Sequence, residues 1–278
     1  MTSRPVFIGM STKMYLGREQ TIAWLDGLAR ALDERRSLAA ERTGSTGSTV
    51  STVVPFVIPS FPLIEAAVDR LASRGALVGA QTSGWADGPY TGEVSPSLLA
   101  ECGVELVEVG HAERRSQFGE DDAMVARKTA AILAAGLTPL LCIGESDRTD
   151  VAGAIACCLD QIEAALEGSV EGVERVILAY EPVWAIGAAQ PADAVHVNGV
   201  VSGLREVLTA GSGLQSGDVR IVYGGSAAPG ILEGLPAVDG LFLGRFAHDV
   251  REFVRALDEA ALRRRGSTDA EQKPTQLS

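Results

Sequence analysis

Short apolar runs recur along the chain and alternate with longer stretches in which apolar residues repeat at helical spacing. The apolar runs cover residues 6–10, 53–58, 77–81, 104–109, 138–143, 176–180, 219–223 and 240–243. Most of them are apolar without interruption, which is typical of parallel strands buried on both faces. The helical pattern occupies residues 21–38, 122–135, 151–166, 192–210 and 249–262, with shorter stretches after Phe61, Ser95 and Ser226.

This unbroken alternation of strands and helices predicts the α/β class and a single closed (β/α)8 barrel, the TIM barrel. A doubly wound open sheet is the alternative. It usually carries a glycine-rich phosphate turn after its first strand, and none follows Met10. We expect one domain over residues 1–263, a surface loop at the Gly/Ser/Thr-rich residues 42–52, and a disordered tail at residues 264–278, which lack apolar periodicity.

Composition narrows the class of protein. The 278 residues carry a net charge of −12 and 46% of them are hydrophobic, which argues against bulk disorder. No apolar stretch is long enough to span a membrane, and residues 1–10 lack the apolar core of a signal peptide. No cluster of basic residues is present that could bind the phosphates of nucleic acid. The four cysteines have no CxxC spacing, so we expect reduced thiols and a cytoplasmic protein.

Side chains suited to chemistry follow three of the predicted strands. Lys13 follows the first strand, His111 the fourth and Glu181 the sixth. In a (β/α)8 barrel these strand ends meet at one mouth, where the active site lies. A carboxylate can take a carbon-bound proton, an imidazole can hydrogen-bond the neighbouring oxygens, and an ammonium can stabilise an enediolate. Together the three residues predict proton transfer beside a carbonyl group.

Glycine-rich turns follow the last two strands, at residues 224–226 and 244–245. Backbone N–H groups in such turns can hold a phosphate dianion. The sequence therefore predicts isomerisation of a small phosphorylated sugar through an enediol(ate), with no metal and no cofactor. The three histidines lack the paired spacing of a metal site. We expect His196 and His248 to be structural and Cys142 to be a small buried residue near the site.

Longer motifs resemble the triosephosphate isomerase family over about residues 6–255. They are VGHAERR at residues 109–115, AYEPVWAIG at 179–187, YGGS at 223–226, PYTGEVS at 89–95 and CIGE at 142–145. The resemblance implies that Lys13, His111 and Glu181 are catalytic; a glutamate base beside a neutral histidine is known from this family and is not worked out from the residues. It also implies that Glu113 and Ser11 support these three, and that Gly187, Ser226 and Gly244 bind the phosphate.

By the same resemblance, two loops have assigned roles. A lid comprises Pro182, Val183, Trp184, Ala185, Ile186 and Gly187, within a lid segment of about residues 182–192. The loop at residues 81–93, which carries Thr91, enters the neighbouring subunit in that family, which implies a homodimer. The expected partners are thus a small phosphorylated sugar and a second copy of the chain, with no nucleic acid and no membrane. The expected process is carbohydrate metabolism.

The sequence departs from the family around the expected substrate. Ser11 replaces an asparagine, Thr12 a tryptophan, Thr82 an asparagine and Ala112 a serine; residues 187–190 read GAAQ in place of GTGK, and Gly244-Arg245 replaces two glycines. The proton-transfer residues are unchanged, so the pattern suggests retained chemistry on a substrate of altered shape. It resembles the branch that converts L-erythrulose 1-phosphate to D-erythrulose 4-phosphate in erythritol catabolism. Arg245 is either a substrate-binding residue or a surface arginine.

Alternatives stay open at this stage. The nearest is triosephosphate isomerase proper, which interconverts dihydroxyacetone phosphate and D-glyceraldehyde 3-phosphate in glycolysis. A phosphosugar-binding barrel without catalysis would tolerate loss of Glu181 or Lys13, and both are present. A purely structural barrel would show no convergence of polar residues at one mouth, and an open-sheet dinucleotide enzyme is a more distant alternative.

Overall fold

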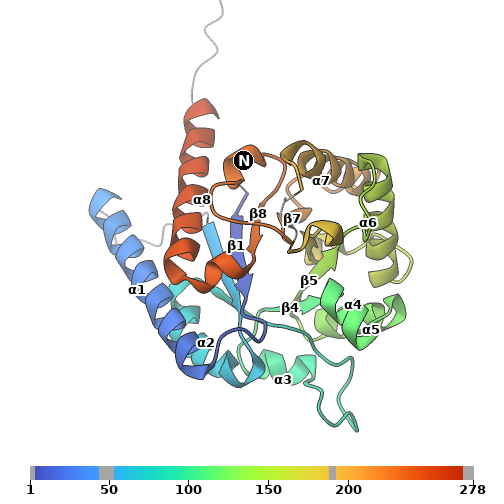
Figure 1. The fold of residues 1–278 in the computed structure, drawn as a ribbon, viewed down its shortest axis with the longest axis horizontal. Helices are drawn as coiled ribbons and strands as arrows, with labels where there is room; N and C mark the ends of the chain where they lie inside the picture. Colours follow the sequence, from blue (N-terminus) through green and yellow to red (C-terminus); the bar gives the residue numbers. More distant parts are fainter. Residues whose placement is uncertain (1–3, 44–52, 188–191, 272–278) are drawn as a thin grey trace, which may run out of the picture.

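Parallel strands close into one barrel in sequence order in the computed structural model, which describes residues 4–43, 53–187 and 192–271 (Figure 1). The strands are β1 (Val6–Ser11), β2 (Val53–Ile58), β3 (Leu77–Ala80), β4 (Leu106–Val109), β5 (Thr138–Ile143), β6 (Ile177–Tyr180), β7 (Arg220–Tyr223) and β8 (Gly240–Leu243). β1 pairs with β2 on one side and with β8 on the other, which closes the barrel. The predicted fold class is confirmed, and each strand lies within two residues of its apolar run.

The inward-facing side chains fill the barrel. They form a separate apolar cluster of Phe7, Phe56, Ile58, Leu106, Leu140, Cys142, Ile177, Ala179, Val222 and Phe242. The rings of Phe56 and Phe242 lie 5.6 Å apart in this cluster. Gly9 makes room for them, because a Cβ at this position would lie 2.0 Å from the Phe56 ring. The barrel is therefore a packed core, and a ligand can enter only at its ends.

Helices surround the strands and bury a second, larger apolar cluster against their outward faces. They are α1 (Arg18–Thr43), α2 (Ile64–Leu71), α3 (Pro96–Glu101), α4 (Ala112–Phe118), α5 (Asp122–Ala134), α6 (Val151–Ala165), α7 (Ala194–Thr209) and α8 (Val250–Glu271). The side chains of Asp121, Asp150 and Asp193 cap α5, α6 and α7 respectively, because each accepts a backbone N–H from the first turn of its helix. β7 connects to β8 through a 3-10 helix, Leu232–Gly234, without an α-helix.

Two predicted boundaries differ from the structure. α8 continues to Glu271, into the segment expected to be a disordered tail, and residues 272–278 lie outside the described residues. α1 runs to Thr43, into the segment expected to be a surface loop, and residues 44–52 are also outside the described residues. Among the helices that the structure describes, none is long and apolar enough to cross a membrane.

Candidate active site

Lys13 lies in a tight turn directly after β1. Its φ of +46° is in the left-handed region, which a non-glycine residue adopts only when its surroundings hold it there. Ser11 Oγ accepts the Lys13 N–H at 3.3 Å. Ser60 Oγ and Gln81 Nε2 both donate to the Lys13 carbonyl at 2.9 Å. Side chains from the end of β1 and from the loops after β2 and β3 thus fix the backbone that orients this lysine.

The Lys13 side chain forms an ion pair with Glu113. Its Nζ lies 2.6 Å from Glu113 Oε1. Burial alone would lower the pKa of Lys13, but the hydrogen bond and charge of Glu113 outweigh it and raise the pKa above its ordinary value. Lys13 therefore keeps its positive charge at neutral pH. Glu113, which the family resemblance gave a supporting role to Lys13, His111 and Glu181, thus contacts the first of them directly.

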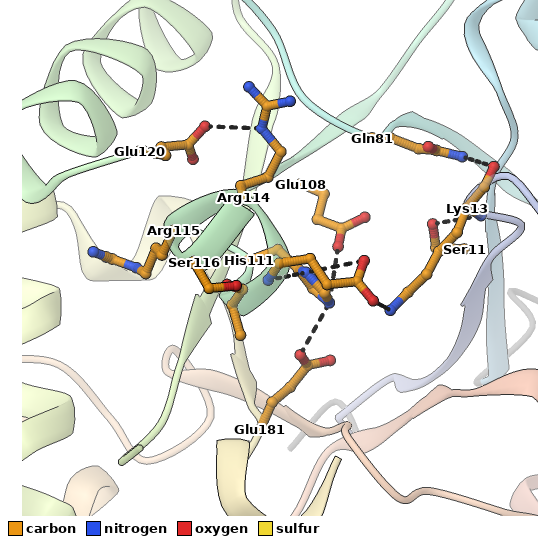
Figure 2. A network of polar contacts seen from close by, with 12 residues as sticks. Ser11, Lys13, Gln81, Glu108, His111, Arg114, Arg115, Ser116, Glu120 and Glu181 are labelled. Carbon is orange, nitrogen blue, oxygen red and sulfur yellow. Dashed lines mark hydrogen bonds and ion pairs between the residues drawn. The ribbon is translucent and has the colours of Figure 1, made fainter. Parts of the chain in front are cut away.

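His111 is held by the start of α4. Its Nδ1 accepts the backbone N–H of Glu113 at 3.1 Å, which makes it the N-cap of this helix. Because Nδ1 is an acceptor, the proton of a neutral imidazole resides on Nε2. Nε2 points into the barrel mouth, 3.5 Å from Glu181 Oε2 and 3.8 Å from Glu108 Oε1 (Figure 2). The imidazole can therefore donate a hydrogen bond to a ligand there.

Glu181 directly follows β6, at a point where its backbone and side chain are closely packed against two glycines. Its N–H donates to the Ile143 carbonyl at 2.8 Å, and its side chain is 6% exposed. A Cβ at Gly144 would lie 2.0 Å from the Glu181 carbonyl oxygen, and one at Gly224 would lie 2.3 Å from Glu181 Oε1. These two glycines allow the carboxylate to reach the mouth. Lys13, His111 and Glu181 thus come together from β1, β4 and β6.

A short segment of the expected lid lies beside the turns that follow β7 and β8, at residues 224–226 and 244–245. Trp184 Nε1 donates to Glu145 Oε1 at 2.8 Å, and the Val183 N–H donates to the Glu145 carbonyl at 3.0 Å. These bonds anchor Pro182, Val183, Trp184, Ala185 and Ile186 to the end of β5. Gly187 has a left-handed φ of +70°. Residues 188–191, which include the departures at the lid tip, lie outside the described residues.

The turns after β7 and β8 form the other side of the mouth. Ser226 Oγ hydrogen-bonds the Tyr223 hydroxyl at 2.8 Å, and the Gly244 N–H contacts the Ala227 carbonyl at 3.5 Å. Ile186 approaches Gly225 so closely that a Cβ there would lie 3.4 Å from its Cγ1. The segment that contains Ile186 and the turns after β7 and β8 are therefore neighbours. Arg245 is exposed and forms no hydrogen bond or salt bridge with another described residue, which leaves its guanidinium available.

Comparison with known proteins agrees with this geometry. The sequence model of the family described as triosephosphate isomerase matches residues 6–260. The chain belongs to the triosephosphate isomerase family. A solved relative, the triosephosphate isomerase of Bartonella henselae, is 27% identical with a TM-score of 0.74, and the match covers 94% of this chain and all of that chain, 100%.

Curated relatives of this triosephosphate isomerase family member carry two names. The L-erythrulose-1-phosphate isomerase of Pectobacterium atrosepticum is 44% identical, over 94% of this chain and 97% of the relative. The protein of the same name from Rhizobium etli is 40% identical over 91% of each chain. The triosephosphate isomerase of a Synechococcus strain is 36% identical, over 93% of this chain and 98% of the relative. The predicted family is confirmed, and the chain is an isomerase.

Sequence reasoning missed three charged residues that build this family member's site. Glu120 accepts the Gly110 N–H at 2.9 Å and the Lys128 ammonium at 2.6 Å, and Lys128 also donates to Thr82 Oγ1 at 3.0 Å. Burial would raise the pKa of Glu120, but these bonds, with one from Arg114, lower it below its ordinary value. The third residue, Glu108, lies inside β4. Nothing in the sequence distinguished these residues from solvated charges on helices or strand edges.

Three other expected residues form no hydrogen bond or ion pair with Lys13, His111 or Glu181 in the described part of the chain. Thr91 is exposed on a loop that projects from the barrel beside α3 (Figure 1). Cys142 is buried, and burial raises the pKa of its thiol well above the ordinary value, so it has little thiolate character. His196 is buried with its Nε2 3.1 Å from the Tyr180 hydroxyl. No group of three or more metal-ligating side chains occurs among the residues that the structure describes.

Proposed function

We propose that this isomerase converts L-erythrulose 1-phosphate to D-erythrulose 4-phosphate through an enediol(ate). The observation that carries the proposal is the convergence of a carboxylate, an imidazole and an ammonium at one barrel mouth. His111 Nε2 lies 3.5 Å from Glu181, and Lys13 reaches the same space from β1 (Figure 2). A general base, a hydrogen-bond donor and a fixed positive charge are what proton transfer beside a carbonyl requires.

Each of these three residues has one task in the proposed reaction. Glu181 takes the proton from C3, and the electron pair of the broken C–H bond forms the C2–C3 double bond. The negative charge that develops on O2 is stabilised by Lys13 and by the Nε2–H of His111. A proton moves from O3 to O2 with the help of the imidazole, and Glu181 returns its proton to C2. The carbonyl group is then at C3, with no net gain or loss of atoms.

Two observations favour the four-carbon ketose phosphate over the triose phosphate. Relatives named L-erythrulose-1-phosphate isomerase reach 44% identity, whereas the Synechococcus triosephosphate isomerase is 36% identical. In addition, the departures from the family pattern lie around the substrate. Ala112 lines a cavity of about 20 Å³ beside Glu181 and Cys142, so the space near the base is not fully packed. Triosephosphate isomerase proper is the second candidate, because one close relative bears that name.

The phosphate group would lie between the lid and the last two turns. Gly187, Ser226 and Gly244 surround this space, and Arg245 adds a charged fork that can bind the phosphate or a substrate hydroxyl. Closure of the segment from Pro182 to Gly187 would exclude water from the enediolate and so prevent loss of phosphate. The protein needs no metal or cofactor for this chemistry in our proposal.

We further propose a cytoplasmic homodimer that acts in carbohydrate metabolism, in erythritol catabolism for the tetrulose phosphate or in glycolysis for the triose phosphate. Large apolar side chains stand exposed on two neighbouring loops: Met14 at 91% and Tyr15 at 57% after β1, and Tyr90 at 39% after β3. Such side chains favour a protein partner over open solvent. The free state of all four cysteines is in keeping with a reducing compartment.

Exchange of substrate hydrogens with solvent tests the proposed function. L-erythrulose 1-phosphate is incubated with the protein in D2O and followed by NMR. We expect deuterium at C3 of D-erythrulose 4-phosphate, the carbon that is C2 in the substrate. With Glu181→Gln we expect almost no deuterium there. A product that forms without deuterium, or no product at all, would contradict the proposed proton transfer or the proposed substrate.

A further inference from the structure

Glu108 is a buried carboxyl group that the reaction described above does not use. It lies in β4, where Leu106 faces the barrel interior and the alternate residues Val107 and Val109 face the surrounding helices. By the alternation of a strand, Glu108 therefore faces inward, one step above Leu106 at the mouth. Its side chain is only 5% exposed.

Few polar groups are available to this side chain. It forms an ion pair with His111 Nε2, 3.8 Å from Oε1, and none of the described residues donates a hydrogen bond to its carboxyl group. Below it lies the apolar cluster of the barrel interior. A buried carboxyl group without a donor is costly to folding. Such a group is retained where a ligand supplies the missing partner.

The order of strands places Glu108 away from the phosphate turns. β4 is diametrically opposite β8 in a closed barrel of eight strands, and the phosphate turns follow β7 and β8. Glu181 follows β6 and Lys13 follows β1, next to the phosphate side, and His111 lies between Glu108 and Glu181 (Figure 2). A substrate with its phosphate at β7 and β8 therefore extends its other end toward β4. In a tetrulose phosphate, that end extends one carbon further than in dihydroxyacetone phosphate and carries its hydroxyl group on C4.

We propose that Glu108 determines substrate specificity by hydrogen-bonding the C4 hydroxyl of the tetrulose phosphate. This inference rests on the proposed function, since it takes the four-carbon substrate as given. A hydroxyl group is both donor and acceptor, so it can pair with the carboxylate or with the protonated carboxyl group. The same contact would fix the far end of the sugar while Glu181 and His111 act on C3 and C2.

The electrostatic surroundings suit a group that pairs with a neutral hydroxyl. Burial raises the pKa of Glu108 to about 7; His111 and Lys13 lower it, and Glu181 and Glu113 raise it. Cys142 faces it from β5 and carries no charge at neutral pH. A carboxyl group that titrates near neutrality and receives no hydrogen bond from the described residues can either donate to or accept from a neutral hydroxyl.

Steady-state kinetics on three substrates test this proposal. They are L-erythrulose 1-phosphate, its 4-deoxy analogue and dihydroxyacetone phosphate. Glu108→Ala should lower kcat/KM for L-erythrulose 1-phosphate by about 30-fold or more, because a buried hydroxyl loses its partner. The other two substrates should change by less than about threefold, since neither has the C4 hydroxyl. Glu108→Gln, which keeps the shape and one acceptor, should give a smaller loss with the same selectivity.

Matched controls separate this role from a structural one. Glu105→Gln makes the same chemical change on the exposed position at the other end of β4 and should leave all three values unchanged. Activity on dihydroxyacetone phosphate reports whether each Glu108 variant is folded. An equal loss on all substrates, or no loss in either variant, would overturn the role of Glu108 while leaving the proposed function intact. A parent protein that prefers dihydroxyacetone phosphate would instead overturn the proposed function, and this inference with it.

Discussion

At the scale of single residues, the ionisable groups around His111 differ in the partners that they contact. Lys13 forms an ion pair with Glu113 at 2.6 Å, whereas Glu181 and Glu108 lie 3.5 and 3.8 Å from the imidazole nitrogen Nε2. A carboxylate that binds an ammonium is not free to approach a substrate carbon, whereas one that lies beside an imidazole at the barrel mouth is. This difference favours Glu181 as the base and Glu113 as the partner of Lys13.

Glu181→Gln should therefore keep the fold and lose most of the turnover. The amide has nearly the same shape but cannot accept a carbon-bound proton, and loss of a general base costs on the order of a hundredfold or more in kcat. The measurement is kcat on the tetrulose phosphate together with the thermal unfolding midpoint. Near-parent turnover in a folded variant would show that another group removes the proton.

Glu108 also predicts how stability depends on pH. Its pKa is about 7 in the folded protein against 4.5 for an ordinary glutamate, so the unfolded chain loses this proton first as the pH rises. The free energy of unfolding should then fall between about pH 4.5 and 7, by at most ~3 kcal/mol from this group. Glu108→Gln should remove that part of the slope and gain stability relative to the parent toward pH 8. The free energy of unfolding is measured by denaturant titration at several pH values. The same pH dependence in the parent and in Glu108→Gln would contradict a raised pKa of Glu108.

At the scale of elements, the sequence predicted strands better than the short connecting structures. Continuous apolar runs mark β1 to β8, since both faces of each strand are buried. α4 was not predicted, because it is short and none of its residues is fully buried, so it has no apolar face to recognise. α8 continues past its apolar pattern, since helix propagation needs only backbone hydrogen bonds.

The residues of the candidate site that directly follow a strand could be predicted from the sequence, because the strands themselves could. Lys13, His111 and Glu181 follow apolar runs directly, so a barrel necessarily brings them to one mouth. Glu108 lies within such a run, and its direction depends on which face of β4 is inside, which the sequence does not state. The contact between Glu120 and Lys128 depends on how α5 packs on the barrel, which the sequence does not show.

The lid segment should respond to phosphate binding. The Val183, Ala185 and Ile186 N–H groups already donate to backbone carbonyls, whereas the Gly187 N–H has no backbone acceptor among the described residues. We expect slower amide exchange at Gly187 when a non-reacting phosphorylated polyol such as glycerol 3-phosphate is bound. Residue-resolved hydrogen exchange measures this, with unphosphorylated glycerol as the control. Unchanged exchange at saturating ligand would argue against lid closure.

At the scale of the whole molecule, the loop after β3 should mediate a homodimer. Trp85 packs edge-on against Tyr90 at 5.5 Å, and Arg127 lies 4.4 Å above the Trp85 ring, so the loop is ordered at its base while Thr91 remains exposed. Thr91→Arg should shift sedimentation from dimer to monomer and reduce activity. Val207→Arg, on an exposed position of α7, should do neither. A fully active monomeric parent would rule out this interface.

The choice of substrate is the central claim, and it is tested most directly by kcat/KM of the parent protein on two substrates. Acceptance of an additional hydroxymethyl group discriminates by about 1–3 kcal/mol through size alone, and by more where buried polar groups lose their partners. We therefore expect kcat/KM for L-erythrulose 1-phosphate to exceed that for dihydroxyacetone phosphate by about tenfold or more. A parent that prefers dihydroxyacetone phosphate would contradict the four-carbon substrate and indicate a divergent triosephosphate isomerase.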